Sequence, residues 1–160
     1  MVRVRRIRPD DAEQLRATRL AALLDTPSAF AKTHAEEVGY PPEAWEYRAV
    51  HSSAGDDSTS LFAEIDGQVV GIVGGYRPEP GLVELVSMWV APDGRGRGAG
   101  AALVGAVAEW AGDDRVELWV TRGNDPAIAL YERCGFVTTD EVQPLPSDPC
   151  KDEIRMRLER

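Results

Sequence analysis

The residues with the clearest chemical meaning form a short run near the middle of the chain, residues 94–100. Glycine stands at every second position of this run, and two arginines lie between the glycines. An apolar segment, 82–90, precedes the run, and a helical pattern, 101–111, follows it. Glycine lets the main chain approach an anion and adopt positive φ, and the amides at a helix N-terminus attract negative charge. Because arginine adds bidentate donors, the run predicts a site for a phosphate or pyrophosphate.

The elements that must position this run follow from periodicity and turn residues. Asp66-Gly67 predicts a hairpin between strands at 61–65 and 68–76. Apolar residues on both faces of 82–90 indicate a central strand that is covered on both sides. The other predicted elements are strands at 2–8, 116–121, 136–139 and 154–158, helices at 11–24, from 42 onward, 101–111 and 126–134, and a loop at 144–149.

Length and composition limit the class of protein. The 160 residues are expected to form a single domain, 1–160. No apolar run reaches the roughly 18 residues of a membrane span, and the N-terminus lacks the apolar stretch of a signal peptide. A net charge of −9 argues against nucleic-acid binding and suits a cationic partner such as an amine. Two cysteines make no disulfide framework, so a cytoplasmic location is expected.

The chain resembles the GNAT N-acetyltransferase superfamily over roughly residues 60–139. Residues 95–100, Arg-Gly-Arg-Gly-Ala-Gly, match that family's acyl-CoA signature Arg/Gln-x-x-Gly-x-Gly/Ala. Residues 88–92, Met-Trp-Val-Ala-Pro, resemble the end of the strand that precedes this signature in the family. Asn124 with 127–136 resembles the family's second block, Asn…Ala…Tyr-x-x-x-Gly-Phe. The resemblance implies an α/β fold, with a mixed, mostly antiparallel sheet flanked by helices on both faces, and acetyl-CoA as co-substrate.

Two other phosphate-binding folds fit the run less well. A Walker loop ends in Gly-Lys-Ser/Thr, whereas this run ends in Gly98-Ala99-Gly100. A dinucleotide-binding fold places Gly-x-Gly-x-x-Gly near the start of the chain, and here the glycine spacing differs and the run lies in the middle.

The resemblance also implies roles for individual residues. Tyr131 is the expected general acid that protonates the departing thiolate, and Glu84 is the expected base that deprotonates an ammonium substrate, directly or through water. The expected cofactor-binding residues are Met88, Trp89, Val90, Arg95, Gly96, Arg97, Gly98, Ala99, Gly100, Asn124, Ala127 and Tyr131. Structural roles are the alternatives: core packing for Trp89 and Tyr131, a helix cap for Asn124 and solvent exposure for Glu84. No metal site is expected, because no cluster has metal-ligand spacing.

The implied reaction is direct attack of a primary amine of a small molecule on the thioester of acetyl-CoA. The acceptor remains open among an aminoglycoside, a polyamine, an amino acid and a protein N-terminus. Residues 15–60 are expected to shape its pocket, with Tyr40, Trp45, Glu36 and Glu37 as candidate lining residues. The alternatives are a protein N-terminal or lysine acetyltransferase, a non-catalytic acyl-CoA sensor and an enzyme for another acyl donor. The alternating segment 154–158 permits a homodimer.

Overall fold

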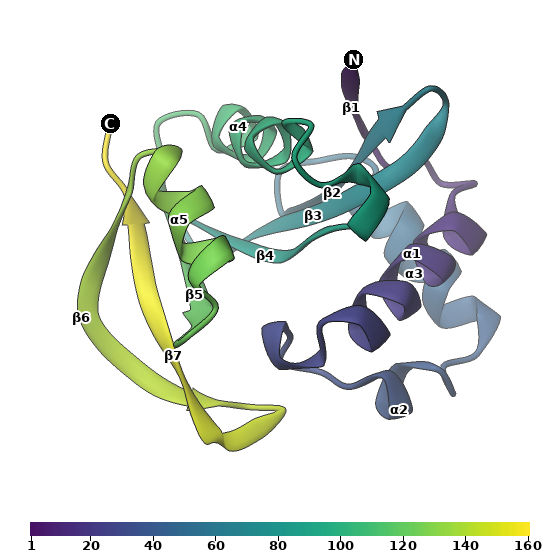
Figure 1. Cartoon of the computed structure of the whole chain (residues 1–160). Coiled ribbons are helices and arrows are strands. Elements are labelled where there is room, and N and C mark those ends of the chain that lie inside the picture. The colour runs from purple at the N-terminus through teal and green to yellow at the C-terminus, as the bar shows by residue number, and fades with distance from the viewer.

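A seven-stranded sheet runs through the computed structural model, which describes residues 1–160 (Figure 1). The strand order is β1-β2-β3-β4-β5-β7-β6, and every neighbouring pair is antiparallel except β4 with β5. The strands are β1 (Val2–Arg6), β2 (Ser58–Ile65), β3 (Gln68–Glu79), β4 (Leu82–Val90), β5 (Arg115–Thr121), β6 (Phe136–Leu145) and β7 (Asp148–Leu158). The predicted mixed, mostly antiparallel sheet is confirmed.

Helices cover both faces of this sheet, as predicted (Figure 1). One face carries α4 (Ala99–Ala111) and α5 (Asp125–Arg133), and the opposite face carries α1 (Ala12–Asp25), α2 (His34–Glu37) and α3 (Pro42–Ser52). Two short 3₁₀ helices, η1 (Pro27–Ala29) and η2 (Pro92–Gly94), lie in the connections after α1 and β4. None of the helices is long and apolar enough to cross a membrane.

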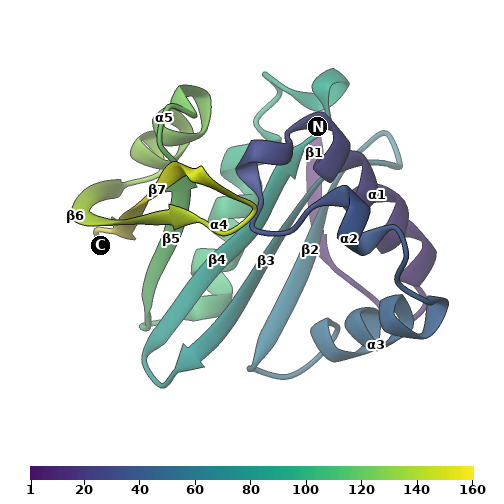
Figure 2. The same cartoon turned by 90° about the horizontal axis from the view of Figure 1, so that it is seen from below.

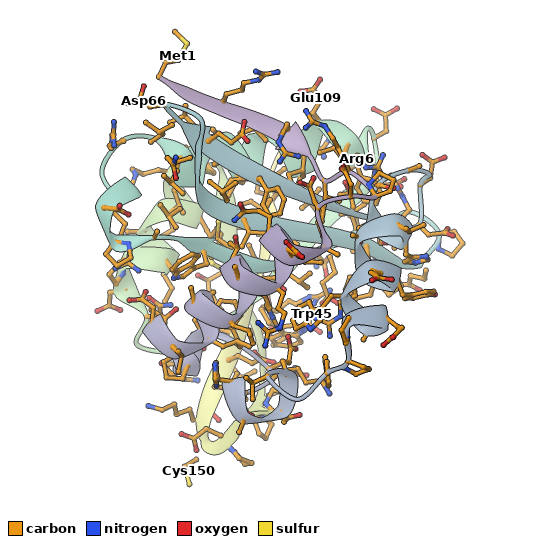
Figure 3. All side chains as sticks on the ribbon, turned by 90° about the vertical axis from the view of Figure 1, so that its right-hand side faces the viewer. Met1, Arg6, Trp45, Asp66, Glu109 and Cys150 are labelled. Carbon is orange, nitrogen blue, oxygen red and sulfur yellow. The ribbon has the colours of Figure 1, made fainter.

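The two faces have separate apolar cores, and the alternation of side chains along the strands explains the division. Leu61 and Ala63 of β2 pack beneath α4 with Leu103, whereas Phe62 between them packs beneath α1 with Trp45. Figure 3 shows Trp45 between α1 and α3, where only 1% of its surface is exposed. The central strands are therefore apolar on both faces, as the sequence of 82–90 indicates.

The last two strands differ from the prediction. The expected loop at 144–149 is wrong, because β6 and β7 form a hairpin whose turn is only residues 146–147. Pro144 is tolerated in β6 because β6 is an edge strand, where a missing amide donor leaves no partner unpaired. β7 lies between β5 and β6, so segment 154–158 has both edges paired and offers none to a second copy.

The β6–β7 hairpin reaches across the sheet to the segment between α1 and α2 (Figure 2). Ser147 Oγ at its turn donates a hydrogen bond to Phe30 O at 2.5 Å, and Thr121 Oγ1 at the end of β5 donates to Ser28 O at 2.6 Å. The segment around Ser28 and Phe30 is therefore held by hydrogen bonds to β5 and to the β6–β7 turn.

Replacing Leu103 with alanine is expected to lower the free energy of unfolding by about 3 kcal/mol, because a fully buried leucine leaves a cavity when it is truncated. Urea unfolding followed by circular dichroism measures the change. Leu24→Ala is the matched control, since Leu24 is 65% exposed and its truncation should change stability little. Equal losses in the two variants would contradict this description of the core.

Candidate active site

The parallel pairing of β4 with β5 stops at Leu85, and the two strands have no paired residues beyond it. At this point Ser87 adopts φ +58, and Ser87 and Met88 together stand opposite the single residue Val73 of β3. This arrangement is a β-bulge, and positive φ at a non-glycine residue is typical of functional sites. The bulge therefore marks where the sheet opens.

A cleft of about 80 Å³ occupies the opening between β4 and β5. Its lining comes from β4, β5, α5 and η1, and consists of Ala29, Leu85, Val86, Ser87, Met88, Trp119, Val120, Thr121, Asn124, Ala127, Leu130 and Tyr131. The structure thus brings together Met88, Asn124, Ala127 and Tyr131, which lie up to 43 positions apart in the chain. The free edge of β4 can pair with an extended ligand, as an added strand would.

Tyr131 is the one titratable side chain that lines this cleft. It is 6% exposed, and its ring packs edge-on against Phe136 with 5.8 Å between ring centroids. The hydroxyl has no hydrogen-bond partner in the chain, yet it is not among the fully enclosed polar atoms. Burial raises the pKa of Tyr131 well above its usual value, because the phenolate loses hydration. The phenol therefore keeps its proton and has a free O–H to donate.

Asn124 both lines the cleft and caps α5. Its Oδ1 accepts a hydrogen bond from the amide of Ala127 at 3.4 Å. Asn124 therefore serves as a helix cap, the structural alternative to ligand binding. Because it also lines the cleft, its side chain can contact a ligand there as well.

The glycine-rich run forms the turn that leads from β4 into α4. Gly96 has φ +75 and Gly98, the N-cap of α4, has φ +87, a region that residues with a Cβ rarely adopt. The amides of residues 96–101 donate no hydrogen bond within the chain. These free amides stand at the positive end of a 13-residue helix, which is the geometry that binds phosphate groups.

The two arginines of the turn differ in their partners. Arg97 is exposed and has no ion pair or hydrogen bond in the chain, so its charge is free for a ligand. Arg95 instead donates to Asp25 Oδ2 at 2.5 Å and to Val90 O at 2.9 Å. Trp89 also donates its indole N–H to Asp25, at 3.0 Å, and its ring is buried beneath α1. The side chains of Arg95 and Trp89 therefore hold the turn against the end of α1 through Asp25.

A second cavity, of about 280 Å³, lies on the opposite face of the sheet. Its walls come from α1, α2, α3 and strands β2 to β4, and its floor includes Gly74, where an added Cβ would lie 3.2 Å from a methyl group of Val86. Val86 and Ser87 line both this cavity and the cleft. The two hollows therefore meet at the bulge, one on each side of β4.

An ion-pair cluster forms one wall of the larger cavity. Glu37, 1% exposed, accepts hydrogen bonds from Arg19 Nε at 3.0 Å and Arg48 Nη1 at 3.2 Å, and Arg19 Nη1 donates to Ser87 Oγ at 3.0 Å. Burial alone would raise the pKa of Glu37, but the two guanidinium groups outweigh burial and lower it. Glu37 is therefore ionised at neutral pH.

Glu84 lies outside the lining of both hollows. Its carboxylate accepts hydrogen bonds from Tyr76 Oη and Arg155 Nη1, and its side chain is 12% exposed. Glu84 is connected to the larger cavity through Tyr76, which lines it. Burial and the hydrogen bond to Glu84 raise the pKa of Tyr76 to about 12.

The structure places the residues expected to line the acceptor pocket in different hollows. Glu37 lines the larger of the two hollows that meet at the bulge, and Glu36 closes a capping box at the start of α2. Tyr40 and Trp45 line a third and more voluminous hollow, of about 560 Å³, between α1 and α3. Sequence reasoning missed Arg19, Arg48 and Ser87. Ser87 had one signal, a hydroxyl between the apolar Val86 and Met88, but the arginines come from helices whose packing the sequence does not specify. No group of three or more His, Cys, Asp or Glu residues is placed to hold a metal ion.

Comparison with known proteins finds acetyltransferases, both by family and among individual relatives. The model of the acetyltransferase (GNAT) family matches residues 20–136. An uncharacterized N-acetyltransferase of Methanocaldococcus jannaschii is 34% identical over 97 residues, or 55% of this chain and 43% of that protein. A mycothiol acetyltransferase of Tsukamurella paurometabola is 32% identical over 133 residues, which cover 72% of this chain and 44% of that protein. The chain thus spans less than half the length of these two relatives.

Solved structures share the fold over nearly the whole chain. A GNAT-family acetyltransferase from Streptococcus pneumoniae aligns with a TM-score of 0.78 at 21% identity, covering 98% of both chains. Spermidine N-acetyltransferase from Vibrio cholerae, in complex with CoA and spermine, also aligns at 0.78, with 16% identity and coverage of 98% and 94%. At these identities the likeness concerns the fold.

Tyr131 is expected to stay protonated up to about pH 10, near the usual pKa of tyrosine, because burial disfavours its phenolate. The ultraviolet absorbance of phenolate, compared between the wild type and Tyr131→Phe during an alkaline titration, measures this. The two curves should coincide up to about that pH. An excess of phenolate in the wild type below it would contradict the buried, proton-retaining phenol.

Proposed function

The chain belongs to the acetyltransferase (GNAT) family, and from this premise we propose that it transfers the acetyl group of acetyl-CoA to a primary amine of a small molecule. The observation that carries the proposal is the meeting of two hollows at the bulge of β4, on opposite sides of Val86 and Ser87. A thioester that enters from the cleft and an amine that enters from the larger cavity would meet at this bulge. Holding two reactants in contact supplies a large part of the rate enhancement in such reactions.

In this proposal the glycine-rich turn binds the pyrophosphate of CoA. The free amides of residues 96–101 and the unpaired cation of Arg97 support this role. The main chain of Met88 to Val90 pairs with the pantetheine arm, and Asn124 and Ala127 line its path toward the thioester. Arg95 acts indirectly, since its side chain holds the turn against Asp25.

The reaction proposed is a direct attack without a covalent enzyme intermediate. The amine nitrogen attacks the thioester carbonyl carbon, and a main-chain N–H near Met88 to Val90 stabilises the oxyanion. As the C–S bond breaks, Tyr131 donates its proton to the departing sulfur. The proton lost by the amine passes through the Tyr76 hydroxyl to Glu84, which already accepts a hydrogen bond from Tyr76. The products are the N-acetyl amine and CoA.

We place this reaction in the cytoplasm and treat residues 1–160 as one domain. Both cysteines are free thiols, one of them exposed, which suits a reducing compartment. All seven strands belong to one sheet, which supports a single folding unit.

Binding of CoA tests the turn directly. Gly98→Val is expected to raise the dissociation constant of CoA by about tenfold, because a β-branched residue at φ +87 costs roughly 1–2 kcal/mol and shifts the free amides. Isothermal titration calorimetry measures the constant. Gly105→Ala in the exposed middle of α4, where an added Cβ meets no atom within 4 Å, should bind CoA as the wild type does. A folded Gly98→Val protein with unchanged affinity would remove the turn from the CoA site.

Turnover tests the general acid. In an assay of free CoA thiol with a panel of amines, Tyr131→Phe should lower kcat by about 100-fold, since the sulfur then leaves unprotonated. Its affinity for acetyl-CoA should stay within about twofold, because the ring remains in place. Tyr47→Phe is the matched control, as Tyr47 is 67% exposed and stacks on His51 away from the cleft. Full turnover by Tyr131→Phe would exclude the phenol as the acid.

A further inference from the structure

The larger cavity has an excess of positive charge. Its lining includes three cations, Arg19, Lys32 and Arg48, and one carboxylate, that of Glu37. Both arginines hydrogen-bond to Glu37, so one unit of guanidinium charge remains uncompensated beside the buried carboxylate. Lys32 adds a further charge, which only the exposed Glu36 approaches, at 3.9 Å. This wall therefore attracts an anion.

Arg48 is the cation with the most unused hydrogen-bonding capacity. Its only hydrogen bond in the chain is the one from Nη1 to Glu37, whereas a guanidinium has five N–H donors. Its side chain is 37% exposed, and its guanidinium carbon lies 4.9 Å from the ring centroid of Trp45 and 5.1 Å from that of Tyr40. The rings hold the guanidinium in place while leaving donors free, which favours bidentate binding of a carboxylate or phosphate.

The rest of the lining suits a small polar ligand. Ser58, Ser60 and Ser87 line the cavity, and the Ser58 Oγ is buried without any hydrogen-bond partner. A buried hydroxyl without a partner is unfavourable unless a ligand or water satisfies it. The volume of about 280 Å³ is at the lower end of what small-molecule sites enclose.

Arg19 links this anion-attracting wall to the reaction point. Its Nη1 donates to Ser87 Oγ at 3.0 Å, and Ser87 is one of the two residues shared with the cleft. An anionic group that contacts Arg19 therefore lies near the bulge where the amine must attack, and Arg48 extends the same wall on the other side of Glu37. A short separation between amine and anion is the geometry of an α-amino acid.

From these contacts we infer that the acceptor is an amine that also carries an anionic group, with an α-amino acid as the favoured class. The inference rests on the proposed function and names its substrate. Arg48, supported by Arg19, binds the anion, and the amine faces Val86 and Ser87. A polyamine is disfavoured, because the only carboxylate lining the cavity is already paired with two arginines.

The test compares acceptors that differ by one carboxylate, at saturating acetyl-CoA. The pairs are L-phenylalanine with phenethylamine and L-ornithine with putrescine, and the phosphate pair is phosphoethanolamine with ethanolamine. The member that carries the carboxylate or phosphate is expected to have a kcat/KM at least about tenfold higher, as a charge-assisted hydrogen bond provides. A larger preference in the phosphate pair than in the two carboxylate pairs would identify phosphate as the anion that the site binds, and the reverse would identify carboxylate. Equal or better use of the partners that lack the anionic group would overturn the inference while leaving the amine transferase intact.

Arg48→Gln is the variant that isolates the anion site. It should raise KM for the amino acid by about tenfold and reduce the preference over the decarboxylated amine toward one, with the affinity for acetyl-CoA unchanged. Arg48→Lys should restore part of the preference, since it keeps the charge but not the bidentate donors. Arg16→Gln, on the exposed side of α1, is the matched control and should behave as the wild type. An unchanged preference in Arg48→Gln would overturn the role of Arg48.

A binding measurement separates this inference from the proposed function. N-acetyl-L-phenylalanine and N-acetylphenethylamine are titrated into the wild type and Arg48→Gln, each saturated with CoA. Tighter binding of the carboxylate compound by the wild type, lost in Arg48→Gln, supports the anion site even if no amine is acetylated. Equal binding of both compounds by the wild type would overturn it even if transfer is observed.

Discussion

The separation of β4 from β5 beyond Leu85 is the constraint on which the site depends. Leu85 and Met88 both contact the core beneath α4 and α5, although three positions apart on a regular strand would place them on opposite faces. The bulge at Ser87 and Met88 inserts one extra residue into β4, so Leu85 and Met88 can point to the same face of the sheet. The same irregularity ends the hydrogen-bonding between the two parallel strands. One local distortion thus opens the cleft and connects it with the larger cavity.

The glycine-rich turn owes its place to the same strand. β4 ends at Val90, and only a short 3₁₀ helix and the turn separate it from α4. The position of α4 is then set by packing, since Leu103 is fully buried and an added Cβ at Gly100 would come within 2.9 Å of Leu130. Free amides, a fixed helix axis and the open edge of β4 are therefore parts of one rigid unit. The turn and the cleft that contains Tyr131 thus lie along the same strand.

Charge is distributed very unevenly in this molecule. The whole chain carries −9, yet the lining of the larger cavity holds three cations and only one carboxylate. Elsewhere the buried charges compensate one another, as where Arg155 contacts both Glu84 and Glu117. The acidic composition agrees with a cationic partner in general, whereas the cavity wall attracts an anion. Local pairing, and not net charge, decides what such a site can bind.

Much of the architecture could be predicted because it is encoded in short patterns. Asp66-Gly67 predicts its hairpin, alternation predicts the strands, and the glycine spacing of 94–100 predicts the anion-binding turn. These signals are local, since φ preferences and side-chain periodicity act over a few neighbouring residues. The mixed sheet and the shared site of Asn124, Ala127 and Tyr131 were implied by the resemblance to the GNAT superfamily. The prediction of a loop at 144–149 failed because a proline such as Pro144, which an edge strand tolerates, looks in the sequence like a proline of a loop.

The tertiary structure alone decided the rest. The bulge at Ser87 depends on which core each side of β4 packs against, and the partners of Glu84 and Arg95 depend on distant strands and helices. The wall of the larger cavity combines Arg19, Glu37 and Arg48 from three helices with strand residues that lie up to 68 positions away in sequence. Ion pairs of this kind leave no spacing pattern in a sequence, because they form only where packing brings separate elements together. The sequence by itself therefore determined the elements and the glycine-rich turn before α4, and the packing of those elements determined the cavity and its charge.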